Sequence, residues 1–154
     1  MKELDKIDQN LLNLLQQNAR LTTKQLSMQL NLSPTAVYER IKKLEREDYI
    51  LNYVAMVNPQ KVKKDFIAFA MLQLAEHSAK NIADFEKNIK ELPEVVACFH
   101  ISGSYDYLLK INLEDMKAFR RFMVEKLTEI PHISNTQSVF SIHEVFNYTA
   151  LPIN

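Results

Sequence analysis

The spacing of apolar residues changes near residues 58–65, and this change limits the chain to two differently built parts. Before it, apolar residues recur every three to four positions, which is the spacing of a helix that buries one face. After it, short apolar runs alternate with helical patterns. The segment Asn58–Asp65 itself begins with Asn-Pro, which favours a turn, and continues with charged residues. The 154 residues therefore predict two domains, 1–58 and 59–154.

The first part contains start signals for three short helices. Asp5 can cap the first helix, Thr22–Gln25 has the spacing of a capping box, and Ser33-Pro34 places a capping hydroxyl before a first-turn proline. Asn31 lies between the last two helices and tolerates a left-handed backbone. Residues 49–57 then have the composition of a strand. This order predicts a winged helix-turn-helix.

The second part predicts the order β-α-β-β-α-β. Its strands are expected at 66–74, 95–101, 107–113 and within 134–148, and its helices at 78–93 and 114–131. The predicted fold is α+β, with a ferredoxin-like domain in which two helices cover one face of a four-stranded antiparallel sheet. Both faces of the strand at 66–74 are apolar, so we infer that a second copy of the chain covers the open face as a dimer.

The third helix carries the only local features that favour nucleic acid, because the chain has 19 basic and 19 acidic residues and no net charge. Burying Val37 and Leu44 leaves a partly basic face outside, with the helix start free to meet base edges or phosphate. We expect its basic residues to account for much of the salt dependence of binding. The alternative is an ordinary solvated helix with pairs such as Glu39–Lys43. The predicted DNA-contacting residues are Ser33, Thr35, Ala36, Tyr38, Glu39, Arg40, Lys42, Lys43 and Arg46.

The loop Ser102–Asp106 contains Gly103, the only glycine of the chain. Its backbone amides could bind the carboxylate of a free amino acid, and Asp106 could bind the ammonium. The alternative is a plain hairpin turn in which Asp106 accepts hydrogen bonds from local amides. Thr136 and Ser138, on one face of the last strand, are further candidate contacts.

Several motifs together resemble the leucine-responsive, or Lrp/AsnC, family of transcription regulators, and the resemblance covers nearly the whole chain. The motifs are Leu4–Asp8, Leu32–Val37, Arg40–Glu45, Tyr49–Tyr53 and Ser102–Lys110. The resemblance implies a winged helix-turn-helix, then a ferredoxin-like domain that dimerises, assembles dimers into tetramers or octamers, and binds an amino acid at the interface between dimers.

On this resemblance the predicted effector-binding residues are Ser102, Gly103, Ser104, Tyr105, Asp106, Thr136 and Ser138. Two departures from the family pattern matter. Tyr38 and Glu39 lie on the face that sets operator preference, and Ser104 stands where an aspartate is common. The sequence therefore does not predict the operator sequence. It also does not predict which amino acid is the effector, whether leucine, methionine, lysine or another.

The sequence argues against an enzyme. The four histidines are scattered, the lone Cys98 is expected as a buried reduced thiol, and one glycine excludes a phosphate-binding glycine loop. No cofactor or metal site is expected, and no apolar run is long enough to span a membrane. We expect a cytoplasmic, nucleoid-associated regulator of amino-acid-related genes that binds double-stranded DNA, with an architectural DNA organiser that lacks an effector as the alternative.

Overall fold

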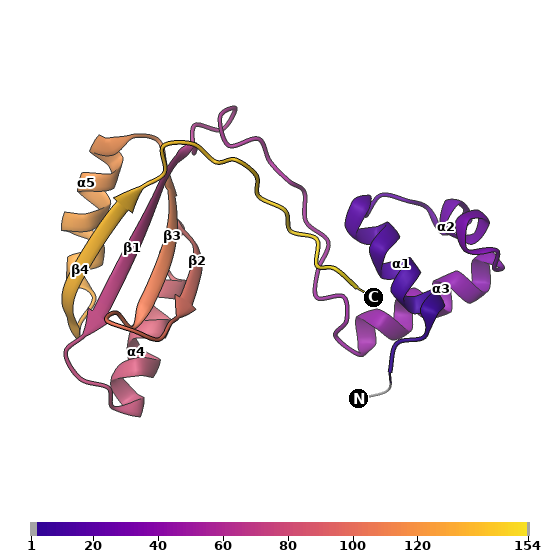
Figure 1. Ribbon diagram of the computed structural model, residues 1–154, viewed down its shortest axis with the longest axis horizontal. Coiled ribbons are helices and arrows are strands. Elements are labelled where there is room, and N and C mark those ends of the chain that lie inside the picture. The colour runs from indigo at the N-terminus through magenta and orange to yellow at the C-terminus, as the bar shows by residue number, and fades with distance from the viewer. Residues whose placement is uncertain (1–2, 154) are drawn as a thin grey trace. The chain divides into compact units, whose positions relative to one another are not determined.

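The computed structural model describes residues 3–153, which divide into two compact units (Figure 1). One unit comprises residues 3–56 and 146–153, and the other comprises residues 57–145. Within the described part of the chain, no helix has the length and apolar character needed to cross a membrane.

The first unit is built on three helices that begin where the sequence predicts. The Asp5 carboxylate accepts a hydrogen bond from the Asp8 N–H at 2.7 Å, and Thr22 and Gln25 form a complete capping box. Ser33 Oγ accepts from the Ala36 N–H at 3.2 Å. The helices are α1 (Lys6–Gln17), α2 (Thr23–Leu30) and α3 (Pro34–Arg46).

A tight turn joins α2 to α3 and sets the angle between them. Asn31 adopts the left-handed conformation with φ 54°, and its N–H donates to the Ser27 carbonyl. Ser27 itself is almost fully buried, as a small residue at the contact between two helices must be. Leu26 and Val37, one on each helix, are completely buried in a shared core. The predicted helix-turn-helix is confirmed.

The strand predicted over residues 49–57 is absent. Residues 51–57 have no regular secondary structure, and Leu51, Val54 and Met56 are 87%, 73% and 68% exposed. A strand needs a neighbour to satisfy its backbone, and none of the described residues pairs with this segment. Its apolar, β-branched composition predicts a strand, but composition cannot supply the partner.

The C-terminal segment differs from the predicted domain boundary, which places all of 59–154 in the second domain. Residues 146–153 belong to the first unit instead. The Gln16 side-chain amide donates a hydrogen bond to the Leu151 carbonyl at 3.0 Å, and its oxygen accepts one from the Leu151 N–H at 2.6 Å. Ile153 packs against the core of the three helices. The last strand ends at Phe140, and residues 141–153 contain no strand, so the part of the predicted strand region beyond Phe140 is not a strand.

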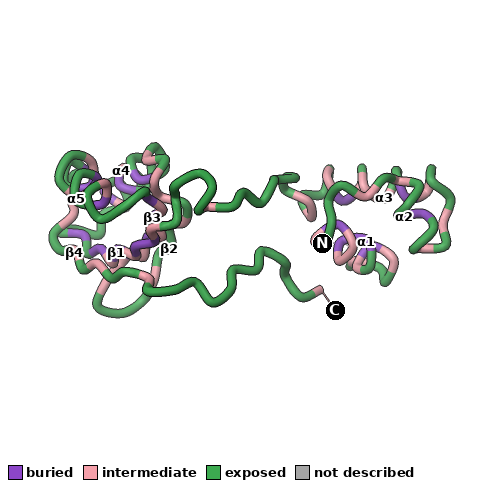
Figure 2. Tube along the Cα trace, turned by 90° about the horizontal axis from the view of Figure 1, so that it is seen from above, coloured by how far each residue is buried: buried purple, intermediate pink, exposed green. Residues whose placement is uncertain are grey.

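The second unit has the predicted β-α-β-β-α-β order. Its antiparallel sheet has the strand order β2-β3-β1-β4, which is the ferredoxin-like arrangement. Figure 2 shows α4 and α5 together on one side of the row of strands. The elements are β1 (Phe66–Leu74), α4 (Ala79–Lys90), β2 (Val95–His100), β3 (Tyr107–Leu113), α5 (Met116–Glu125), a short 3-10 helix (Leu127–Glu129) and β4 (Ile133–Phe140).

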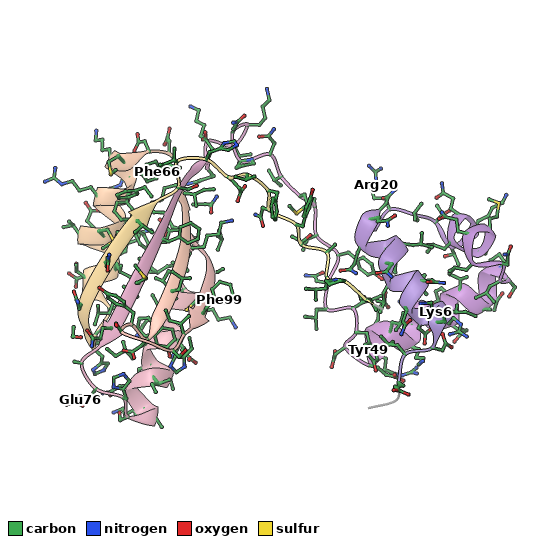
Figure 3. The ribbon with its side chains drawn as sticks, in the orientation of Figure 1. Lys6, Arg20, Tyr49, Phe66, Glu76 and Phe99 are labelled. Atoms are coloured by element: carbon green, nitrogen blue, oxygen red, sulfur yellow. The ribbon has the colours of Figure 1, made fainter. Side chains whose placement is uncertain are left out.

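The two faces of this sheet are both apolar but are covered differently. On the helical face Leu72 and Leu109 are fully buried with Phe85 of α4 in one core. On the other face Phe99 of β2, labelled in Figure 3, is 55% exposed, and Val139 of β4 is 43% exposed. The expected apolar open face is therefore present.

Candidate DNA-binding surface and ligand loop

The outer face of α3 is exposed as the sequence predicts. Thr35, Tyr38, Glu39, Lys42 and Arg46 are all exposed. The opposite side of the helix is anchored, because Val37 and Leu44 are completely buried. This surface offers hydroxyl, carboxylate and cationic groups in a row along one helix, which is the donor and acceptor set that reads base edges and phosphates.

The start of α3 is organised by Ser33. Its hydroxyl oxygen already accepts the Ala36 N–H at 3.2 Å, so Ser33 acts first as the helix cap. Pro34 follows at the first helical position and has no N–H to satisfy. Ser33 and Ala36 thus fix the end of the helix that presents Thr35.

Two of the predicted DNA-contacting cations face α1. Asp8 is completely buried, and its carboxylate accepts from Arg40 Nη1 at 2.6 Å and from Lys43 Nζ at 2.8 Å. Arg40 Nη1 also bonds the Asp5 carboxylate at 2.6 Å. The hydrogen bonds to Asp5 and then Asp8 raise the pKa of Arg40 above its ordinary value, and the bond to Asp8 raises the pKa of Lys43. No local sequence signal links Asp8 to Arg40 and Lys43, which lie 32 and 35 residues away in the chain.

The other two cations of α3 differ in their partners. Lys42 Nζ lies 2.7 Å from the Glu45 carboxylate and 5.8 Å from the centroid of the Tyr38 ring. Glu45 also accepts from the Tyr53 hydroxyl at 3.1 Å, and burial together with this bond raises the pKa of Tyr53 to about 12. Arg46 is in none of the ion pairs formed within residues 3–153.

The loop between β2 and β3 has the backbone that the sequence predicts. Gly103 has φ +124°, a conformation in which any residue with a Cβ is strained. The N–H of Ile101 donates to the Asp106 carbonyl at 2.8 Å and closes the loop. Ser102, Gly103 and Ser104 are exposed at its tip, where their backbone amides can meet a ligand.

Asp106 is held at the base of this loop. Its carboxylate accepts from the Leu74 N–H at 2.7 Å and lies 2.8 Å from His77 Nε2. The Leu74 bond, and then the His77 bond, lower the pKa of Asp106 below its ordinary value. The carboxylate is therefore ionised at neutral pH, and it is bonded to the end of β1 and to His77. No local sequence signal links His77 to Asp106, because the two residues lie 29 positions apart in the chain.

The structure does not bring all the predicted effector residues to one face. The Tyr105 hydroxyl bonds the Gln137 side chain at 2.8 Å, whereas Thr136 and Ser138 pair with Leu72 and Ala70. Because side chains alternate along a strand, Thr136 and Ser138 point to the helical face and Gln137 to the open face. Gln137 is thus the β4 residue that contacts the loop, and the residues on either side of it point the other way.

Cys98 is not buried as expected. It is exposed on the edge strand β2, although partial burial and the nearby Glu86 carboxylate raise the pKa of its thiol. Among the described residues, no group of histidine, cysteine, aspartate and glutamate side chains could hold a metal ion.

These features define a class of protein: a DNA-binding regulator that couples a helix-turn-helix to a ligand-binding domain. The winged helix-turn-helix DNA-binding model matches residues 4–50, and the Lrp/AsnC ligand binding domain model matches residues 67–151. The chain belongs to the Lrp/AsnC family of transcription regulators.

Relatives with this architecture match nearly the whole chain. The chain is 35% identical over 144 residues to the leucine-responsive regulatory protein of Escherichia coli K12, covering 94% of this chain and 88% of the relative. It is 36% identical over 143 residues to a proline dehydrogenase transcriptional activator of Rhizobium radiobacter, covering 93% and 92%. A transcriptional regulator from Neisseria meningitidis, solved in complex with L-methionine, has a TM-score of 0.92, 34% identity, and coverage of 99% and 98%.

Proposed function

We propose that this regulator binds specific operators near amino-acid-related genes and that a free amino acid, held by the loop 102–106, modulates its DNA binding or assembly. The observation that carries this proposal is the joining, in one chain, of an exposed recognition helix and a loop built around an ionised carboxylate and free amides. Leucine and methionine are the first candidates, since two similar proteins are named for or solved with them.

The DNA-binding step uses the exposed face of α3. Thr35, Tyr38 and Glu39 near its start contact base edges, while Lys42 and Arg46 contact phosphate. Arg40 and Lys43 contribute less, because Asp5 and Asp8 already neutralise them. A dimer presents two such helices to half-sites about one helical turn, roughly 34 Å, apart.

The effector step uses the loop and the neighbouring sheet end. Amides at Ser102, Gly103 and Ser104 bind the carboxylate of the amino acid, and Asp106 binds its ammonium. Tyr105 and Gln137 are already bonded to each other there, so both belong to the same surface. Thr136 and Ser138 lie at that end of the sheet but on its helical side, and contribute through the strand rather than by direct contact.

Assembly follows from the uncovered apolar surface. The open face of the sheet carries Phe69, Met71, Leu108, Phe99 and Val139, and the last two are 55% and 43% exposed. A second copy that packs sheet against sheet covers this face, and dimers then join into tetramers or octamers. Such a protein acts on DNA in the cytoplasm as part of the nucleoid.

Two measurements on the full chain test this function. Affinity for a duplex from the region upstream of its own gene should exceed affinity for a shuffled duplex of equal length, and equal affinities would favour an architectural DNA organiser. In thermal unfolding, a few related amino acids should stabilise the folded chain. The free energy of unfolding should increase by about 2.7 kcal/mol when the amino acid is present at 100 times its dissociation constant. The Asp106→Asn variant should lose that stabilisation, and no stabilisation of the wild-type chain by any amino acid would contradict an effector role.

A further inference from the structure

A cavity of about 360 Å³ opens between α4 and the edge strand β2, and residues 102–106 of the loop are not among the residues that line it. This volume lies within the range of small-molecule sites. Glu86, Ile89 and Lys90 of α4 form one wall of the cavity. Residues of β2 between Val95 and His100, Cys98 among them, form the other wall, and Tyr107 of β3 also lines the space.

The cavity lies where α4 and β2 both border Tyr107 of β3. Phe85 of α4 packs on Tyr107 with ring centroids 4.5 Å apart. Cys98 and His100 pair with Leu109 and Tyr107, so their side chains point to the helical face, yet both residues are exposed. Polar and apolar groups of the edge strand therefore line a space that the protein itself does not fill.

The wall from α4 carries one carboxylate and one ammonium. Glu86 and Lys90 are four residues apart, which places them on the same side of the helix, one turn from each other. The Glu86 carboxylate is fixed in place, since it accepts the Tyr107 hydroxyl at 2.9 Å. Both groups border the cavity.

The remaining surface is apolar or uncharged. Ile89 is 2% exposed, and the flat face of Tyr107 is stacked with the His100 ring at 4.7 Å between centroids. Burial and the Glu86 charge raise the pKa of the Cys98 thiol, so the thiol is neutral at pH 7. One negative and one positive group beside an apolar wall are complementary to a zwitterion that has an apolar side chain.

We propose that this α4–β2 cavity binds a free α-amino acid with a compact apolar side chain, within a single protomer. Its ammonium binds Glu86, its carboxylate binds Lys90, and its side chain contacts Ile89 and Val95. The inference rests on the proposed function in taking an amino acid as the ligand, and adds a second site that is distinct from the loop.

The position of the cavity connects it to the loop site. His100 precedes Ile101, and Tyr107 follows Asp106; the Ile101 N–H and the Asp106 carbonyl close the loop at 2.8 Å. His100 and Tyr107 both line the cavity, so the cavity borders the strands at the two points where the loop begins and ends. Any effect of the cavity ligand on affinity at the loop must be matched by the reverse effect.

Cys98 supplies a site-specific measurement, because it is the only cysteine of the chain and lines the cavity. The rate of its alkylation by a maleimide is measured above neutral pH, where the thiolate reacts. L-leucine, L-methionine and L-valine serve as probes, and L-leucinamide, which lacks the carboxylate, is the control ligand. An occupied cavity slows alkylation about tenfold at ten times the dissociation constant.

Matched variants separate the two sites. Glu86→Gln keeps an acceptor for the Tyr107 hydroxyl but removes the negative charge, and Lys90→Gln removes the ammonium from an exposed position. Both variants should therefore fold. In both, the amino acid should no longer protect Cys98 from alkylation. Asp106→Asn should keep the protection. Each rate is compared with and without amino acid in the same variant, since Glu86→Gln also changes the basal reactivity of Cys98.

The outcomes distinguish this inference from the proposed function. Protection in the wild-type chain and Asp106→Asn, lost in Glu86→Gln and Lys90→Gln, supports the cavity site. Protection lost in Asp106→Asn but kept in Glu86→Gln overturns the cavity site and leaves the loop effector intact. If calorimetry detects amino-acid binding but Cys98 is not protected, the cavity site is likewise overturned and the loop effector stays intact. If calorimetry detects no amino-acid binding at all, both fail.

Discussion

Replacing Asp8 with alanine tests most sharply how the recognition helix is held. The Asp8 carboxylate is completely buried and joins α1 to α3 through Arg40 at 2.6 Å and Lys43 at 2.8 Å. The substitution removes both bonds and leaves two cations facing an apolar core. We expect it to weaken the packing of the whole first unit, not only the contact at position 8.

The magnitude follows from the exposure of the partners. A hydrogen bond to a charged group contributes about 1.5–3 kcal/mol, and two are lost here. The Arg40 and Lys43 side chains are 27% and 30% exposed, so water replaces part of what Asp8 supplied. Arg40 also keeps its bond to Asp5. The expected loss in unfolding free energy for Asp8→Ala is therefore about 2–3 kcal/mol, below the 3–5 kcal/mol typical of breaking a fully buried pair.

The assay is thermal unfolding of the full chain, followed by hydrogen exchange that resolves the two units. For a domain of about 60 residues, the size of the first unit, a loss of about 2–3 kcal/mol lowers Tm by roughly 8–24 °C. The Asp8→Asn variant should lose less unfolding free energy than Asp8→Ala, since an amide has nearly the same shape as the carboxylate it replaces. The control is Asn10→Ala, an exposed position on the same helix. If Asp8→Ala and Asn10→Ala are equally stable, the bonds from Asp8 to Arg40 and Lys43 do not stabilise the first unit.

Three further predictions concern the DNA surface, the loop and a helix cap. Arg46→Ala should reduce the slope of log K against log salt by about one phosphate contact. Lys43→Ala should reduce it by less, because Lys43 is already paired with Asp8, whereas Arg46 is in none of the ion pairs among the described residues; an equal change in both would contradict this. Because its folded-state pKa is lowered, Asp106 stabilises the second unit above its ordinary pKa of 3.8, and this contribution should disappear as the pH falls through the lower folded value. An acid-unfolding curve with the same slope for Asp106→Asn would be the contrary result. Ser33→Ala should destabilise α3 by about 1 kcal/mol in chemical denaturation, because the Ala36 N–H loses its acceptor; a change indistinguishable from zero would show that water replaces the cap.

Much of the local structure could be predicted because its causes are local. The caps at Asp5, Thr22 and Ser33 each bond a backbone group three residues away, and Asn31 and Gly103 adopt positive φ where the chain must turn. The alternation of apolar residues likewise predicts the sheet and its helical cover. Signals within a few residues of each other are visible in a sequence.

Features that depend on distant residues could not be predicted. The strand expected at 49–57 has no pairing partner among residues 3–153, and the Asp8 partners lie 32 and 35 residues away. Cys98 appears buried from its apolar neighbours but lies on an edge strand, which only the strand order reveals. The alternation of a strand places Thr136 and Ser138 on one face of β4, but only the register of β4 against β1 shows that this is the helical face.

We propose that this protein links the binding of an amino acid to the binding of DNA. The affinity of the full chain for a duplex from upstream of its own gene, titrated with and without L-leucine or L-methionine at fixed salt, tests this link. We expect an effective amino acid to change this affinity or the assembly state on DNA, and we expect the Asp106→Asn variant to bind DNA normally but to lose the change. Specific DNA binding that no amino acid alters, in affinity or in assembly, would contradict it.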